Sequence, residues 1–318
     1  MSTFYDVFNG DADGICALHQ LRLAAPCTSV LITGAKRDIA LLERVPAQAG
    51  DVVTVLDISM ARNAGPLRDL LDRGATCRYF DHHSAGTIPV HERLEAHIDP
   101  SRDVCTSLIV DRVLEGKFRP WAVVAAFGDN LMESAFAAAA PLKLNEFQLG
   151  QLQELGECIN YNAYGASVDD LHYHPADLYR RIAPYYDPFQ FITGEPILEV
   201  LRTARGDDLA RVTEIAPVEI SADSAVYVLP DEAWSRRVNG TYINRLATAN
   251  PERAHAMLIR HDEYYAVSVR APVADPRAAN ELCRKFGGEG RVGAAGIDRL
   301  PVTDCESFIG AFKATYAG

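Results

Sequence analysis

Short apolar runs alternate with amphipathic segments along the first hundred residues. The apolar runs, each short enough for a buried strand, lie at residues 5–8, 30–32, 52–56 and 77–80. Helical spacing follows at residues 15–23, 39–45 and 66–71. This alternation predicts a parallel sheet covered by helices.

The pattern changes after residue 104. Longer helical segments lie at residues 104–114, 120–130 and 142–158, and Pro120 suits the first turn of a helix. Periodicity weakens over residues 187–220, where residues 197–212 form an amphipathic connecting segment. The last third again alternates, with strands expected at 224–228, 256–259 and 264–269 and helices at 234–247 and 276–286.

The chain is therefore predicted to be an α/β protein with two domains. Its 318 residues exceed the usual size of one domain. We expect an N-terminal parallel-sheet domain over residues 1–190, a linker over 191–220, and a smaller C-terminal α/β domain over 221–318.

Composition narrows the functional classes. A formal net charge of −12 argues against a surface that grips long duplex nucleic acid. Seven scattered cysteines without a CxxC pair predict reduced thiols rather than a zinc or redox site. No signal segment or bilayer-length apolar run is present, so we expect a cytoplasmic protein with no membrane partner.

Acidic residues follow three of the predicted strands. Asp11 and Asp13 lie in the sequence NGDADG after the first strand, Asp57 follows residues 52–56, and Asp81-His82-His83 closes the run at 77–80. Ligands of open α/β sheets lie beyond the carboxyl ends of the strands. We therefore expect these side chains to converge.

Each acid also has a structural explanation. An N-cap accounts for one of Asp11 and Asp13 but not for both. Asp57 at a buried strand end is costly unless it is hydrogen-bonded, exposed or bound to a cation. Asp129, in FGDN, is either a helix-end cap or a last ligand. Carboxylates with the imidazoles of Asp81-His82-His83 suit Mn²⁺ or a similar ion, and the lack of thiols disfavours structural zinc.

The order DADG, VLDIS, DHH and FGDN resembles the DHH phosphoesterase superfamily, which includes RecJ exonucleases, NrnA-type oligoribonucleases and cyclic dinucleotide phosphodiesterases. The later segment GGEGRVGAAG is similar to the substrate loop of the DHH-associated domain. The resemblance spans nearly the whole chain. It implies a DHH domain followed by a substrate-binding domain.

The resemblance also implies residue roles. Asp11 and Asp57 would hold one Mn²⁺, with Mg²⁺ or Co²⁺ as alternatives. A second ion would bind Asp13, Asp57, His82 and Asp129, so that the catalytic Asp57 bridges the two ions. His83 would be catalytic through contact with the scissile phosphate. The residues implied in substrate binding are Arg270, Gly287, Gly288, Gly290 and Arg291.

Two departures from the family pattern bear on these roles. Many relatives have a histidine shortly before the two acids, whereas this chain has Phe8 and Asn9. An amide oxygen is a weaker ligand, so the first ion binds loosely or is completed by water. Arg291 and Val292 replace a histidine and a proline of the substrate loop, and a guanidinium still binds phosphate bidentately.

The expected function is a Mn²⁺-dependent phosphoesterase that hydrolyses short oligonucleotides or dinucleotides to 5′-mononucleotides by a two-metal mechanism. One alternative is a 3′-phosphoadenosine 5′-phosphate phosphatase or a cyclic nucleotide phosphodiesterase. A non-enzyme alternative is a nucleotide-binding sensor that has lost turnover. The expected partner is the short substrate itself, and a homodimer is left open.

Overall fold

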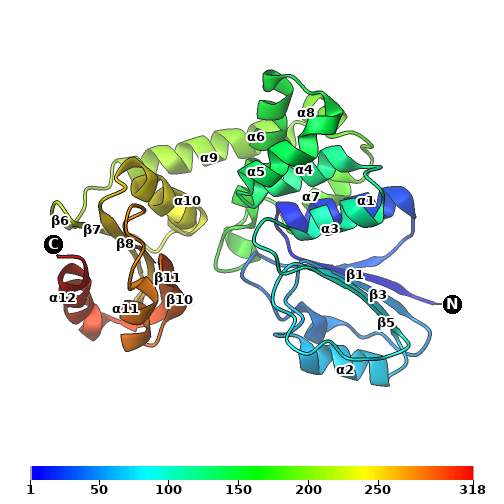
Figure 1. Ribbon diagram of the computed structural model, residues 1–318, viewed down its shortest axis with the longest axis horizontal. Coiled ribbons are helices and arrows are strands. Elements are labelled where there is room, and N and C mark those ends of the chain that lie inside the picture. The colour runs from blue at the N-terminus through cyan, green and yellow to red at the C-terminus, as the bar shows by residue number, and fades with distance from the viewer. Residues whose placement is uncertain (1, 318) are drawn as a thin grey trace. The chain divides into compact units, whose positions relative to one another are not determined.

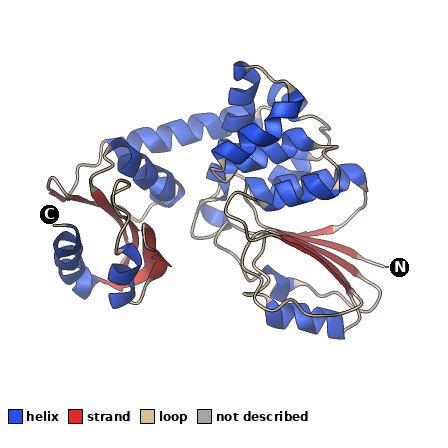
Figure 2. Ribbon diagram, viewed as in Figure 1, coloured by secondary structure: helices blue, strands red, loops and turns tan. Residues whose placement is uncertain are grey.

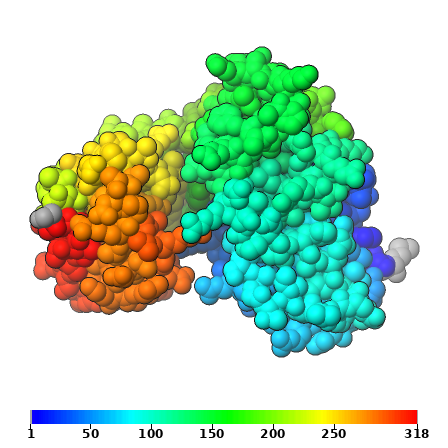
Figure 3. Space-filling view, in the orientation of Figure 1, coloured from blue at the N-terminus to red at the C-terminus, as the bar shows by residue number. Residues whose placement is uncertain are grey.

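The computed structural model describes residues 2–317, which form two compact units (Figure 1). The first unit extends to Thr203 and the second begins at Ala204. This boundary falls inside helix α9 (Ile197–Thr213). Each unit has its own sheet and its own core, and Figure 3 shows their surfaces coloured along the chain.

The first unit is built on a five-stranded parallel sheet in the order β2-β1-β3-β4-β5. Its strands are β1 (Phe4–Phe8), β2 (Val30–Ile32), β3 (Val52–Leu56), β4 (Thr76–Asp81) and β5 (Leu94–Ile98). The predicted parallel sheet is thus confirmed. Sequence analysis missed β5, which is an edge strand whose residues are only partly buried or exposed.

Helices cover both faces of this sheet (Figure 2). They are α1 (Ala12–Ala24), α2 (Ala64–Asp72), α3 (Thr106–Val113), α4 (Arg119–Gly128), α5 (Met132–Ala139), α6 (Glu146–Ala163), α7 (Pro175–Ile182) and α8 (Pro188–Gly194). The helix expected at residues 39–45 is a single 3₁₀ turn, Leu41–Arg44. Pro46 follows it, and the residue before a proline disfavours helical backbone.

Two cores lie on opposite faces of the sheet. Phe8, Leu56 and Phe80 pack against the helical layer that contains α1, α4 and α6. Residues one position earlier, Val7 and Val55 among them, pack on the other face with α2. Successive strand side chains point to opposite faces, so both faces of these strands are buried.

Two glycines let the helices approach closely enough to place Asp129. A Cβ added at Gly156 of α6 would lie 2.2 Å from the Val124 carbonyl oxygen of α4. A Cβ at Gly128, the last residue of α4, would lie 2.5 Å from Cβ of Ala12 in α1. Because these two residues have no side chain, the end of α4 can lie against the start of α1. Asp129 follows directly.

The second unit contains a six-stranded mixed sheet in the order β10-β11-β9-β8-β7-β6. Its elements are β6 (Glu219–Ile220), β7 (Ser224–Leu229), α10 (Ala233–Ala249), β8 (Ala254–Arg260), β9 (Tyr264–Arg270), α11 (Ala279–Lys285), β10 (Glu289–Arg291), β11 (Ala294–Pro301) and α12 (Cys305–Tyr316). Only β7 and β8 pair in parallel. A core of aliphatic and aromatic side chains from the strands, α11 and α12 supports the sheet.

The glycine-rich segment at residues 287–296 differs from the sequence-based expectation in one respect. It is not an open loop, because β10 pairs with β11 in a short antiparallel hairpin. Gly290 has a φ of 147°, a conformation that side chains rarely adopt. The hairpin therefore depends on glycine at that position.

No helix within residues 2–317 has the length and apolar character needed to span a membrane.

Candidate metal centre

The carboxyl ends of β1, β3 and β4 meet at one edge of the parallel sheet. A cavity of about 670 Å³ opens there in the first unit. Its lining includes five of the predicted site residues together with Asn9 and Lys36: Asn9, Asp11, Lys36, Asp57, His82, His83 and Asp129. The structure therefore brings together side chains that are far apart in the sequence.

Asp11 has two different environments for its two carboxylate oxygens. Its Oδ1 caps helix α1 by accepting the backbone N–H groups of Asp13 and Gly14, both at 3.0 Å. Its Oδ2 lies 2.5 Å from Nζ of Lys36. Burial raises the pKa of Asp11, but the Lys36 ammonium and these hydrogen bonds outweigh that effect and lower it. The capping explanation and the ligand explanation both apply to this residue.

Asp13 is fully buried behind the cavity rather than in its lining. It accepts the backbone N–H groups of Thr106 at 2.7 Å and Ser107 at 2.6 Å, at the start of α3. One oxygen of Asp13 still lies within 4.8 Å of ligand atoms of His82 and Asp129. Charge-assisted bonds from the helix terminus fix this carboxylate in place.

Asp57 lies at the centre of the cluster. Its backbone φ is 58°, a left-handed conformation that is uncommon for a residue other than glycine. Its Oδ1 accepts the hydroxyl of Thr106 at 3.2 Å and lies 3.3 Å from Nε2 of His82. Burial, followed by the nearby carboxylates of Asp11 and Asp13, raises the pKa of Asp57 well above its usual value. A divalent cation would relieve that repulsion.

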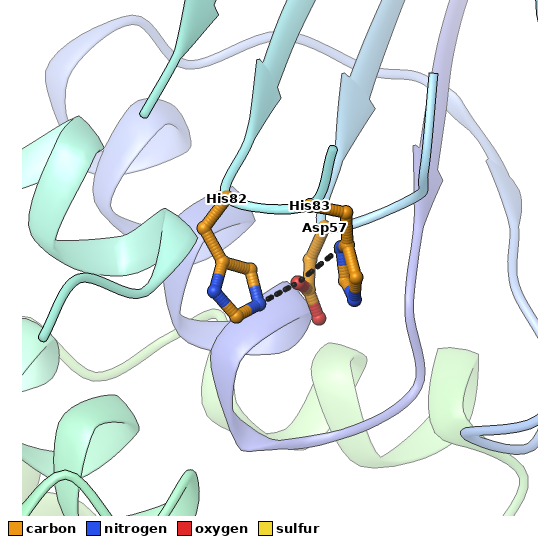
Figure 4. A group of neighbouring side chains, drawn as sticks. All are labelled: Asp57, His82 and His83. Atoms are coloured by element: carbon orange, nitrogen blue, oxygen red, sulfur yellow. Dashed lines mark ion pairs between the residues drawn. The ribbon is translucent and has the colours of Figure 1, made fainter. Parts of the chain in front are cut away.

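His82 presents one ring nitrogen to Asp57, as Figure 4 shows. Its Nδ1 lies 2.9 Å from the carbonyl oxygen of Val104, so that nitrogen holds the proton and donates it. Nε2 then has a free lone pair, 3.3 Å from Asp57 and 3.9 Å from Asp129. A backbone acceptor behind one nitrogen is the usual arrangement of a metal-binding histidine.

His83 lies beside the cluster and is tied to Asp81. Its Nδ1 is 2.7 Å from Oδ1 of the buried Asp81 and 3.9 Å from Asp57. Burial lowers the pKa of His83, but the Asp81 carboxylate outweighs burial, so the net shift is upward. A His83 imidazole that retains its proton suits contact with a phosphate oxygen.

Asp129 and Lys36 complete the cavity wall. Burial raises the pKa of Asp129 to about 6, although the Lys36 ammonium opposes the rise. Nζ of Lys36 lies 3.0 Å from Oδ1 of Asp129. Sequence analysis missed Lys36, although its place shortly after β2 was a usable signal. Strand β2 adjoins β1, so the segment after it must end beside Asp11.

The donor set fits a hard or borderline divalent ion. Carboxylates and imidazoles form two overlapping groups whose ligand atoms lie within 4.8 Å of one another: Asp57, His82 and His83, and Asp13, His82 and Asp129. The buried Oδ1 of Asn9 has no hydrogen-bond partner among the described residues. Its amide orientation is fixed because Nδ2 donates to the carbonyl of Lys36 at 3.3 Å. A bound cation would satisfy that oxygen.

The predicted substrate-binding residues lie together in the second unit. They line a separate cavity of about 650 Å³: Arg270, Gly287, Gly288, Gly290 and Arg291. Arg270 ends β9, and its guanidinium donates to Oδ1 of Asn244 at 2.7 Å and to the carbonyl of Val269 at 3.0 Å. Glu289 and Asp298 also line this cavity, so it is not uniformly basic.

No protein-family model and no curated protein matches the sequence. Solved structures do match over 99% of the chain. One manganese-bound RecJ exonuclease is 18% identical, with a TM-score of 0.65 and 90% of its own length covered. A DHH domain from a protein described as a member of a ribosomal-protein family is 13% identical, with a TM-score of 0.65 and 86% of its length covered.

Another match is the pGpG-specific phosphodiesterase PggH from Vibrio cholerae, which is 12% identical. Its TM-score is 0.57, and 99% of each chain is covered. Identities this low establish shared architecture rather than shared chemistry. They confirm the predicted fold: the chain has the DHH-type fold of RecJ and PggH, with a parallel-sheet unit followed by a mixed-sheet unit.

Proposed function

We propose that the chain is a metal-dependent phosphoesterase that hydrolyses short oligonucleotides or dinucleotides to 5′-mononucleotides. The observation that supports this most strongly is the position of Asp57, which is close to residues of both proposed ion sites. Its carboxylate interacts with that of Asp11 and lies 3.3 Å from Nε2 of His82, in a cavity lined by acids and imidazoles. The proposed cofactor is Mn²⁺, with two ions bridged by Asp57.

Bound divalent ions would lower the pKa of a water and neutralise phosphate oxygens during in-line attack. The chain itself supplies the geometry. Asp11 and Asp57 would hold one ion, and Asp13, Asp57, His82 and Asp129 the other. Thr106 steadies Asp57 through its hydroxyl, and Val104 fixes the tautomer of His82. No serine or cysteine nucleophile is needed.

His83 is the proposed contact to the scissile phosphate. Asp81 holds its Nδ1 and raises its pKa, so that the opposite nitrogen remains a proton donor. Donation to a non-bridging phosphate oxygen would stabilise the charge that develops in the transition state. Asp81 acts through His83 and is a positioning residue.

The substrate class is proposed from charge and cavity size. The net charge of −12 disfavours long nucleic acid, whereas a cavity of about 650 Å³ with Arg270 and Arg291 matches a nucleotide-sized ligand. RecJ is an exonuclease and PggH is specific for pGpG. We propose that residues 1–190 are the catalytic domain, 191–220 the linker and 221–318 the substrate-binding domain of a cytoplasmic enzyme.

The test is incubation of purified protein with a 5′-phosphorylated dinucleotide and Mn²⁺, followed by chromatography of the products. The expected result is metal-dependent release of 5′-mononucleotide that EDTA abolishes. Parallel reactions contain 3′-phosphoadenosine 5′-phosphate, a cyclic dinucleotide and a long single strand. No hydrolysis of any of these with Mn²⁺, Mg²⁺ or Co²⁺ would refute an enzymatic role.

A further inference from the structure

Lys36 places an ammonium group inside the acidic cluster. Nζ lies 2.5 Å from Oδ2 of Asp11 and 3.0 Å from Oδ1 of Asp129, and it lies 5.8 Å from the ring centroid of Tyr164. The protein thus supplies one positive charge of its own to the proposed metal centre.

The backbone of Lys36 is anchored on two sides. Its N–H donates to the carbonyl of Ala163, at the end of α6, over 2.9 Å. Its carbonyl accepts Nδ2 of Asn9 over 3.3 Å. These two hydrogen bonds therefore hold the backbone of Lys36 near Asp11. The same Asn9 leaves a buried, unpartnered Oδ1.

The two carboxylate oxygens of Asp129 lie near different neighbours. Oδ1 faces Lys36 at 3.0 Å, whereas Oδ2 lies 3.9 Å from Nε2 of His82. The oxygen of Asp129 that lies nearer His82 is therefore not the one that contacts the ammonium. Asp11 offers no comparable oxygen, because its Oδ1 caps α1 and its Oδ2 contacts Lys36.

From this asymmetry, and resting on the proposed metal-dependent function, we propose that Lys36 is a resident cation that competes with the divalent ion at Asp11. The ion held by Asp13, His82 and Asp129 binds first and more tightly. Loading at Asp11 requires the ammonium to withdraw from Oδ2 or to tolerate a second cation beside it. Two like charges at such distances repel each other.

The experiment measures Mn²⁺ binding, not turnover. Isothermal titration calorimetry and electron paramagnetic resonance of free Mn²⁺ are applied to the full chain and to Lys36→Met. Wild type should show two binding steps that differ at least tenfold in affinity, or one step only. Lys36→Met should tighten the weaker step at least tenfold, or create it, while the tighter step changes less than threefold.

Matched variants separate charge from shape. Lys36→Arg keeps the positive charge and should leave the weaker step as in wild type. Lys143→Met removes an exposed lysine that does not line the cavity and should change neither step. Asn9→Ala should weaken only the weaker step, which would assign that step to the Asp11 side.

Lys36→Gln, which retains a donor to the two acids, replaces Lys36→Met if circular dichroism shows that the methionine variant is unfolded. Two steps of equal affinity in wild type, or a weaker step that is unchanged or still absent in the folded neutral variant, would overturn the role of Lys36 alone. Absence of any saturable Mn²⁺ binding in wild type would instead overturn the proposed metal-dependent function, and this inference with it.

Discussion

The Nδ1 atom of His83 lies 2.7 Å from Oδ1 of the buried Asp81. No other hydrogen bond to the His83 ring is found within residues 2–317. Asp81 therefore determines both the orientation of this imidazole and the upward shift of its pKa. Two consequences of this hydrogen bond can be measured separately: the pKa of His83 and the rate of turnover.

Asp81→Asn should lower the pKa of His83, because the carboxylate that favours the imidazolium is lost. NMR titration of the metal-free protein would record the shift. Turnover should fall by about 10²-fold or more, whereas Mn²⁺ affinity should stay within threefold. An unchanged His83 titration would contradict the positioning role of Asp81.

Asp57→Asn should abolish turnover and weaken Mn²⁺ binding, because the carboxylate proposed to hold both ions becomes a neutral amide. Asparagine tolerates the φ of 58° at this position, so the fold should persist. The metal-free variant should melt at a higher temperature than wild type, because burial and neighbouring acids disfavour the Asp57 carboxylate. Differential scanning calorimetry in EDTA measures this.

Asp72→Asn, at an exposed position that ends α2, is the control and should alter neither activity nor melting. Equal Mn²⁺ affinity in wild type and Asp57→Asn would remove Asp57 from the metal centre.

Gly156→Ala should destabilise the first unit by about 2 kcal/mol or more. The added Cβ would lie 2.2 Å from the Val124 carbonyl oxygen, so α4 and α6 must separate. Gly150→Ala is a matched control in the same helix, where nothing lies within 4 Å of the new Cβ. It should stabilise by roughly 0.5–1 kcal/mol through helix propensity. Urea unfolding of both variants checks the contrast.

His19 should make the protein sensitive to mild acid. Burial lowers its pKa from 6.5 to about 4, and its Nε2 lies 2.8 Å from the carbonyl of Tyr185. A depressed folded-state pKa gives stability that is present above pH 6.5 and is lost as pH falls toward 4. The loss amounts to about 3 kcal/mol at most.

His19→Gln keeps a donor for the Tyr185 carbonyl and does not titrate. The drop in unfolding free energy between pH 7 and pH 4, measured in EDTA, should be smaller in this variant. His255 in the second unit has a similarly lowered pKa, to about 4, so a residual drop is expected there. A full-sized drop in the first unit of His19→Gln would exclude His19 as its source.

Much of the parallel sheet follows from local pattern. Strands β1, β3 and β4 are largely apolar runs buried on both faces, and each is followed at once by a polar residue at the carboxyl edge of the sheet. Their parallel order then brings the acids together without further information. Strand β5 escaped detection because Glu95 and His97 interrupt its apolar positions at a sheet edge.

Lys36 shows why part of the site could not be predicted. The place of Lys36 after β2 indicated that its backbone lies near Asp11, but a lysine after a short strand usually extends into solvent, and the sequence does not give the direction of this side chain. Its direction depends on a backbone bond to Ala163, which lies more than a hundred residues later in the chain. The β10–β11 hairpin is similar, because the pairing of a glycine-rich segment depends on its neighbour rather than on its own composition.

The Asp11 carboxylate serves both as a helix cap and as a proposed metal ligand. One oxygen starts helix α1 and the other faces the cavity, so the rotamer that begins the helix also orients the proposed ligand. Formation of the first helical turn therefore prepares this part of the centre before any ion arrives. Asp11→Ala would remove the cap and the proposed ligand together, whereas Asp11→Asn would keep an acceptor for the cap and neutralise only the proposed ligand.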